Sequence, residues 1–165
     1  MIKFNAYHFV GDTLRDGRPV PKDGEVLVHD GPVIMCASGL HASRTAWQAL
    51  VYAPGTTLCR VRVGDIRAER ENDKLVGSRR TIIERIDATN LLRRFARKQA
   101  LSVVNNWNAP DEVRQYLITG DDSLRSAAES AAESAAWSAA ESAAESAAEG
   151  QFNALVDEEF REASK

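Results

Sequence analysis

Three histidines and two cysteines are the side chains best suited to metal binding or nucleophilic chemistry. They are His8, His29, His41, Cys36 and Cys59, and only Cys36 and His41 are close together in the sequence. Zinc sites usually contain paired ligands such as C-x-x-C or two histidines a few residues apart, and the chain has neither pair. We therefore expect no metal ion and no cofactor, and we expect both cysteines to be small, reduced core residues.

A nucleophile beside His41 is a second candidate for chemistry. Ser38, Ser43 and Cys36 flank His41, and a serine or cysteine nucleophile needs such a base within hydrogen-bond distance. Sequence proximity alone does not give that geometry, and Gly39 is more typical of a turn with positive φ. The phosphate-loop patterns G-x-x-x-x-G-K-[ST] and G-x-G-x-x-G do not occur in the chain.

Clustered arginines are the third candidate, because arginine binds phosphate and carboxylate groups through paired hydrogen bonds. Arg60 and Arg62 share one face of an alternating segment, and Arg79 and Arg80 follow in the next segment. We predict that these four residues and His41 contribute to a ligand or partner site. Acidic residues are interspersed among them and the pI is about 5.7, which argues against a nucleic-acid partner.

Charge is distributed unevenly along the 165 residues. Residues 1–120 contain 18 basic and 13 acidic residues, whereas residues 121–165 contain 3 and 11, so net charges of +5 and −8 give the total of −3. We predict a compact domain over 1–120 and an acidic helical segment over 121–165. The chain shows no signal peptide and no apolar run near the ~20 residues that span a bilayer, so we expect a cytoplasmic protein without membrane contact.

The first half of the chain has the pattern of a sheet. Ser43 is a suitable N-cap for a short helix that Pro54 and Gly55 end. The charged segment 67–80 reads as an exposed turn, and 81–88 as a strand or the approach to a helix. Alternating or β-branched segments predict strands at residues 3–10, 25–29 and 56–66.

The second half has helical periodicity. Residues 89–107 form an amphipathic pattern, and residues 110–119 form a second helix closed by Gly120. The fold class is therefore α+β: an N-terminal twisted, mainly antiparallel sheet with one short helix, followed by a helical C-terminal half that ends in a long Ala/Ser/Glu helix. The apolar face predicted for the helix at residues 89–107 consists of Leu92, Phe95, Ala96, Val103 and Trp107.

Six tetrads of the form S-A-A-E fill residues 126–149, with Trp137 in place of one glutamate. A four-residue step advances each glutamate by about 40° around an α-helix, so the glutamate row winds around the helix. We predict that Trp137 anchors this helix to the body or to a partner, and that the neighbouring Glu133 and Glu141 are candidate partner-binding residues. Alternatively, the repeat is a tolerated spacer. A second apolar stripe follows it, made of Phe152, Leu155, Val156 and Phe160.

Some features resemble ADP-ribosyltransferases. Those enzymes have small split-sheet folds, an early polar or aromatic residue on a strand and a late catalytic glutamate. Here Tyr7 and His8 would supply the early position, and Glu69 or Glu71 the late one. Because both glutamates lie in a charged run that is typical of a solvated surface, this remains an alternative.

Several motifs together resemble a widespread family of small phage and prophage proteins. They are Y-x-F at 7–9, C-A-S-G-L-H-A-S at 36–43, D-K-L-V at 73–76, L-L-R-R-F-A-R-K-Q-A-L at 91–101 and the Ala-rich terminal repeat. The resemblance implies a mobile-element origin and an accessory role, with no assigned activity. Many relatives have a second cysteine where this chain has Ser43, which weakens a shared thiol or metal role for the box.

Three functions follow as hypotheses. The favoured one is a non-enzymatic phage-encoded protein that binds and inhibits or modulates a host protein, plausibly against a defence system. The second is a module that sequesters a phosphorylated or nucleotide signal at the arginines. The third is an ADP-ribosyltransferase-like enzyme. The alanine-rich faces of the C-terminal helix also permit self-association into a homo-oligomer.

Overall fold

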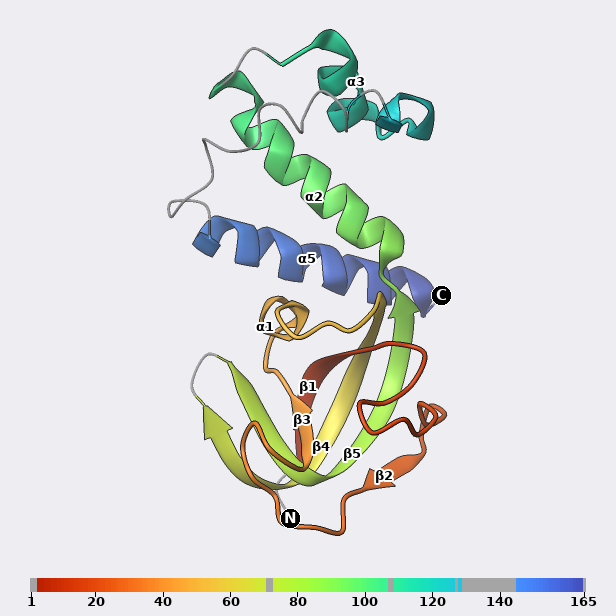
Figure 1. Cartoon of the computed structure of the whole chain (residues 1–165), viewed down its shortest axis with the longest axis vertical. Coiled ribbons are helices and arrows are strands. Elements are labelled where there is room, and N and C mark those ends of the chain that lie inside the picture. Colours follow the sequence, from red (N-terminus) through yellow and green to blue (C-terminus); the bar gives the residue numbers. More distant parts are fainter. Residues whose placement is uncertain (1–2, 71–72, 107–108, 127, 129–144, 165) are drawn as a thin grey trace. The chain divides into compact units, whose positions relative to one another are not determined.

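The computed structural model of the chain describes residues 3–70, 73–106, 109–126, 128 and 145–164 (Figure 1). It divides into two compact units, Met1–Thr89 with Val156–Lys165, and Asn90–Leu155. The elements are β1 (Lys3–Val10), β2 (Val26–Val28), β3 (Leu40–Ala42), α1 (Ala46–Leu50), β4 (Thr57–Arg70), β5 (Lys74–Asp87), α2 (Thr89–Val103), η1 (Val104–Asn106), α3 (Asp111–Thr119), η2 (Asp122–Leu124) and α5 (Glu145–Ala163).

The first unit is an antiparallel sheet that curls almost into a ring. Its strand order is β1-β4-β5-β2, and β3 pairs with the start of β5. Backbone hydrogen bonds between Tyr7 and Ser43, of 2.8 and 2.9 Å, then join β1 to the end of β3. The strands β1, β4, β5 and β3 therefore follow one another around a common interior. The α+β fold class predicted from the sequence, a mainly antiparallel sheet with one short helix and a helical second half, is confirmed.

Side-chain alternation separates an interior row from an outer row on each strand. Cys59 is fully buried in the interior, as predicted, whereas Cys36 is exposed, so the prediction of a core position is wrong for Cys36. Cys36 lies in a loop with a positive φ of 65°, where its side chain points away from the core. The apolar interior consists of Ala6, Val10, Ala42, Cys59, Val61, Val63, Leu75 and Ile82.

The charged segment 67–80 is not the exposed turn that we predicted. β4 continues to Arg70 and β5 begins at Lys74, so most of the segment belongs to a long hairpin (Figure 1). Gly77 lets the two strands approach closely, because a Cβ atom at this position would lie 2.4 Å from the carbonyl oxygen of Gly64. Arg67, Glu69, Arg70 and Arg79 occupy solvent-facing positions of paired strands, whereas Arg80 is buried. A run of exposed charged residues resembles a loop in sequence.

The helix after β3 begins later than predicted. Its N-cap is Thr45, not Ser43, because Thr45 forms a capping box with Gln48 while Ser43 is used in the backbone pairing with Tyr7.

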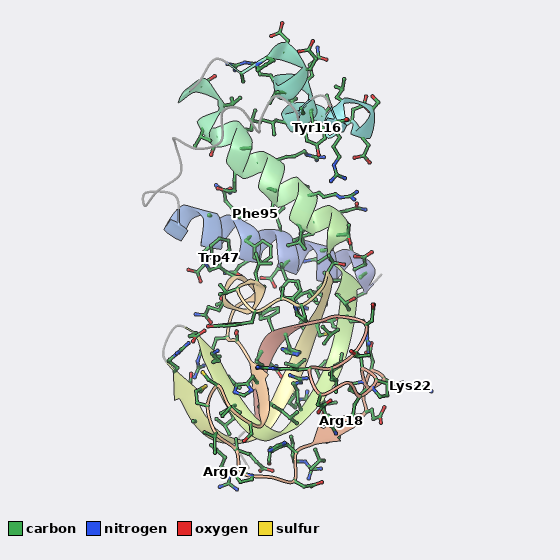
Figure 2. All side chains as sticks on the ribbon, in the orientation of Figure 1. Arg18, Lys22, Trp47, Arg67, Phe95 and Tyr116 are labelled. Carbon is green, nitrogen blue, oxygen red and sulfur yellow. The ribbon has the colours of Figure 1, made fainter. Side chains whose placement is uncertain are left out.

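The second unit is helical. Phe95 of α2 packs edge-to-face on Phe152 at 5.1 Å between ring centroids, and Val104, Ala109, Val113 and Ala128 form a separate small core. Figure 2 labels Phe95 on α2 and Tyr116 on α3. Gly120 closes α3 in the left-handed conformation, as predicted. The predicted apolar face of α2 is partly wrong, since Leu91 is buried and Ala96 is exposed, and Trp107 lies outside the described residues.

The C-terminal stripe is confirmed as a buried helical face, since Phe152, Leu155, Val156 and Phe160 on α5 are all buried. The predictions for the tetrads, with Glu133, Trp137 and Glu141, fall on residues 129–144 and lie outside the described residues. Among the helices that are described, none combines the length and apolar character needed to cross a membrane. Over the same residues, no group of three or more His, Cys, Asp and Glu is arranged as a metal site requires.

Candidate functional site

The four arginines predicted to form one site lie on two faces of the sheet. In the pairing of β4 with β5, Arg62 is opposite Thr81, and Val63 is opposite Arg80. Val63 belongs to the interior, so Arg80 also faces inward, whereas Arg62 and Arg60 face outward. Arg79 is exposed on the outer face. The sheet therefore separates an outer arginine pair from an inner arginine.

A pocket of about 390 Å³ lies on the outer face, and we call it the outer pocket. A bulge in β5 makes Glu84 pair with Arg60 and Ile82 with Val61, which leaves Ile83 as an extra residue beside Glu84. Ile83 remains 42% exposed and supplies apolar surface. The lining residues are Asn5, Ala6, Tyr7, Arg60, Val61, Arg62, Ile83 and Glu84.

Arg60 is the centre of the polar contacts in the outer pocket. Its guanidinium donates to Glu84 Oε1 at 2.8 Å and to Asp157 Oδ1 at 2.9 Å, and it stacks over the Phe160 ring at 4.4 Å. The Tyr7 hydroxyl also donates to Asp157 Oδ1, at 3.3 Å. Partial burial lowers the pKa of Arg60, but hydrogen bonds with Glu84, Tyr7 and Asp157 outweigh it, so the pKa is raised and Arg60 stays charged.

Arg62 differs from Arg60 because none of the described residues holds its guanidinium. It is exposed, and within the part of the chain that the structure describes it makes no ion pair or hydrogen bond. Tyr7 keeps its proton, because burial raises its pKa. The outer pocket thus offers one held guanidinium, one uncommitted guanidinium and a phenolic donor.

The interior carries a second polar group, which we call the inner cluster: Arg80, His8 and His41. Arg80 is only 5% exposed, and its Nη1 donates to the His41 carbonyl oxygen at 2.6 Å. Burial lowers the pKa of Arg80 to about 10. In the described residues no carboxylate lies within ion-pair distance of Arg80, and Asp16, the acid whose charge acts on it, is paired with Arg18.

His8 joins this cluster from β1, where it is opposite Cys59 and shares the interior row with Ala6 and Val10. Burial lowers the pKa of His8 well below its ordinary value, and the nearby charges of Arg80 and His41 lower it further. His8 is therefore neutral at pH 7. From the sequence we considered His8 only as a metal ligand or as the early residue of an ADP-ribosyltransferase, and we did not group it with His41 and Arg80. A polar side chain in an apolar alternating row was the available signal.

The loop before β3 fixes the position of His41. The backbone N–H of Cys36 donates to His41 Nε2 at 3.1 Å, across a turn in which Gly39 has φ of 108°. A Cβ atom on Gly39 would lie 2.7 Å from Val76 Cγ2, so only glycine fits. Burial lowers the pKa of His41, and the charges of Lys74, Arg80 and Arg15 add to this effect. The C-A-S-G-L-H-A box therefore has a structural role: it positions His41 beside Arg80.

The arrangement does not assemble the nucleophile that the sequence suggested near His41. His41 Nε2 already accepts the N–H of Cys36, the Ser38 hydroxyl donates to the Pro32 carbonyl, and Ser43 is buried. Burial raises the pKa of the Cys59 thiol to about 11, so that thiol stays protonated.

The residues suggested for an ADP-ribosyltransferase are also apart. Tyr7 is opposite Arg60, and Glu69 lies nine positions further along β4, on the order of 30 Å along the strand. Glu69 is paired with Arg44, and Glu71 lies outside the described residues.

Comparison with known proteins assigns the sheet unit to a family. No curated protein and no solved structure matches the chain. Residues 4–94 match the family model of a domain of unknown function, DUF7666, from within β1 into α2. This range contains the inner cluster and all the residues that line the outer pocket. Because the match covers more than half of the chain, the protein belongs to the DUF7666 family.

Proposed function

We propose that the sheet unit is a non-enzymatic module that binds and sequesters a small phosphorylated ligand at the inner cluster. The observation that carries this proposal is Arg80, a 95% buried cation beside two imidazoles, with no carboxylate at ion-pair distance among the described residues. A buried charge is costly unless it is paired. A phosphoryl group would supply the missing negative charge.

The donor inventory of the inner cluster fits a phosphoryl oxygen. Arg80 has five N–H donors, and its hydrogen bond within the described residues goes to one acceptor, the His41 carbonyl oxygen. A dianionic group near His8 would also favour protonation of its ring, which turns that imidazole into a cationic donor. His41 stays neutral while its Nε2 accepts the Cys36 N–H. His8 and His41 both remain partly exposed, so a ligand can approach them from solvent.

In a phage setting, such a module would act by removing a signal from solution. The resemblance to phage and prophage accessory proteins supports this role, because several kinds of cellular signal carry phosphate groups that an arginine-centred site would recognise. Under this proposal the ligand is a nucleotide-like signal of the host, and the chain needs no catalytic group.

A second candidate is direct binding to a host protein. It is supported by β2, which lies at the edge of the sheet order and exposes Val26 and Val28. An edge strand with exposed valines can accept a strand from a partner. Replacing Val28 with lysine should then abolish co-purification of the partner, whereas replacing Val51, which is exposed on a different element, should not. Equal capture by both variants would exclude the edge strand.

The first proposal can be tested through the three histidines, which give separate NMR signals. Protein without a histidine tag would be titrated with pyrophosphate at pH 7 while the imidazole C–H resonances are recorded. We expect a saturable shift of the His8 signals toward the protonated state, a saturable shift of the His41 signals because its carbonyl oxygen is bonded to Arg80, and no shift of His29, which lies outside the cluster. His29 is thus a control in the same spectrum.

Two variants identify the cation that is responsible. Arg80→Lys keeps a positive charge but loses the planar donors, and it should weaken pyrophosphate binding by at least about tenfold. Arg79→Lys, at the exposed neighbouring position, should bind like wild type. Unshifted histidines, or equal weakening by both variants, would refute the proposal.

A further inference from the structure

A carboxylate of the C-terminal helix, that of Asp157, contacts two of the residues that line the outer pocket, and these contacts indicate what the pocket recognises. Asp157 Oδ1 accepts from Arg60 Nη2 at 2.9 Å and from the Tyr7 hydroxyl at 3.3 Å. Asp157 is far from both in sequence, and its side chain is 54% exposed. A single exposed carboxylate can leave these donors by rotating its side chain into water, without movement of the helix that carries it.

That helix is firmly held, so only the Asp157 side chain is exchangeable. Val156 and Phe160 are both fully buried, and Phe160 lies under the Arg60 guanidinium. Arg60 also stays fixed when Asp157 leaves, because Glu84 holds its other nitrogen at 2.8 Å. The donors on Arg60 and Tyr7 are therefore preorganised for an incoming acidic group.

The charges of the pocket limit that group to a single negative charge. With Asp157 rotated away, Arg60 and Arg62 oppose one carboxylate, Glu84, which leaves one positive charge to be balanced. Arg60 and Arg62 are two positions apart on one face of β4, roughly 7 Å between Cα atoms, so both long side chains can reach one carboxylate. A phosphate dianion would leave one negative charge unbalanced in the outer pocket.

We propose that the outer pocket is a second binding site, specific for a small monocarboxylate whose carboxylate replaces that of Asp157 on Arg60 and Tyr7. Arg62 provides the added attraction, and the exposed side of Ile83 contacts the uncharged body of the ligand. The volume of about 390 Å³ accommodates a molecule of this size. The site is separate from the inner cluster, so it does not depend on the proposed function.

Fluorine NMR with 4-fluorobenzoate as the probe tests this proposal. Wild type should broaden and shift the probe signal saturably, whereas the isosteric neutral 4-fluorobenzamide should not bind. The Asp157→Asn variant removes the competing charge and should bind the benzoate several-fold more tightly than wild type. Arg62→Gln should weaken binding by about tenfold or more.

Matched variants on the same elements separate specific recognition from a general charge effect. Glu162→Gln changes an exposed acid on the same helix, and Arg67→Gln changes an exposed arginine of β4 outside the pocket (Figure 2). Both should bind the benzoate like wild type. The proposal is overturned if Asp157→Asn shows no benzoate binding, if the amide binds equally well, or if Arg62→Gln and Arg67→Gln behave alike. The histidine signals in the same samples report separately on the inner cluster.

Discussion

Replacing Arg80 with methionine should separate stability from binding at the inner cluster. The buried guanidinium has a pKa lowered from 12.5 to about 10. Since each pKa unit corresponds to about 1.4 kcal/mol, burial disfavours the charged form by roughly 3 kcal/mol. The hydrogen bond to the His41 carbonyl oxygen returns about 1.5–3 kcal/mol, as is usual when the donor is charged.

The Arg80→Met variant removes both the cost of burying the charge and the hydrogen bond to the His41 carbonyl oxygen, and it fills the space with a flexible apolar side chain. Its free energy of unfolding should therefore equal that of wild type or exceed it by up to about 2 kcal/mol, as is often found when buried charges become apolar. Pyrophosphate binding should be lost in the same protein. This combination is expected of a residue kept for a ligand rather than for folding.

Urea unfolding can be measured through Trp47, which lies on α1 in the sheet unit (Figure 2). The chain has three tryptophans, so a background with Trp107→Phe and Trp137→Phe makes the emission specific for Trp47. Arg79→Met is the control, and a change within about 0.5 kcal/mol is expected at that exposed position. If Arg80→Met lowers the free energy of unfolding by more than about 2 kcal/mol, Arg80 is a structural support, and the reasoning behind the proposed function fails.

Three further predictions concern the parts that position the two sites. The pKa of His8 is lowered in the folded state, so His8 of the unfolded chain takes up its proton first as the pH falls below about 6.5. The free energy of unfolding should therefore decrease from that pH toward the lowered pKa. His8→Gln should reduce this pH dependence, and an unchanged slope in urea titrations would contradict the prediction. Gly39→Ala should lower stability by roughly 2–4 kcal/mol, since φ is 108° and Val76 is too close; a loss below about 1 kcal/mol would show that the loop readjusts. Phe160→Ala removes a fully buried ring under Arg60 and should cost about 3–5 kcal/mol by the same Trp47 assay, whereas a negligible loss would mean that α5 does not stabilise the sheet unit.

The sequence predicted the positions of strands and helices better than the contacts between residues that are far apart in the chain. Alternation in β1 and in the first part of β4 indicated strands correctly because apolar and polar residues follow the two-residue period. The same rule failed over 67–80, where most of the described charged residues occupy exposed positions of a two-stranded ribbon and the sequence therefore resembles that of a loop. The residue that allows the close approach of the two strands, Gly77, acts through its distance in space from the backbone of Gly64.

For a related reason, the sequence indicated only part of the spatial arrangement of the residues that we predicted to bind a ligand or partner. Arg60 and Arg62 do line one pocket, but adjacent residues of a strand face opposite sides, so Arg79 and Arg80 could not both join them. The partners of Arg60 come from β5 and from the C-terminal helix, at separations that no local pattern encodes. The contact of Asp157 with Tyr7 spans 150 positions.

The two sites differ in which part of the chain completes them, and this difference suggests how they relate. Arg80, His8 and His41 all fall within residues 4–94, so the inner cluster is contained in the DUF7666 domain. The outer pocket is also lined from within that range, yet Asp157 and Phe160 come from beyond it. A sheet domain that ended near residue 94 would leave the donors of Arg60 and Tyr7 open. The C-terminal helix therefore adds to the domain a bound carboxylate that a ligand must displace, which makes the affinity of the outer pocket a property of this chain's own C-terminal segment.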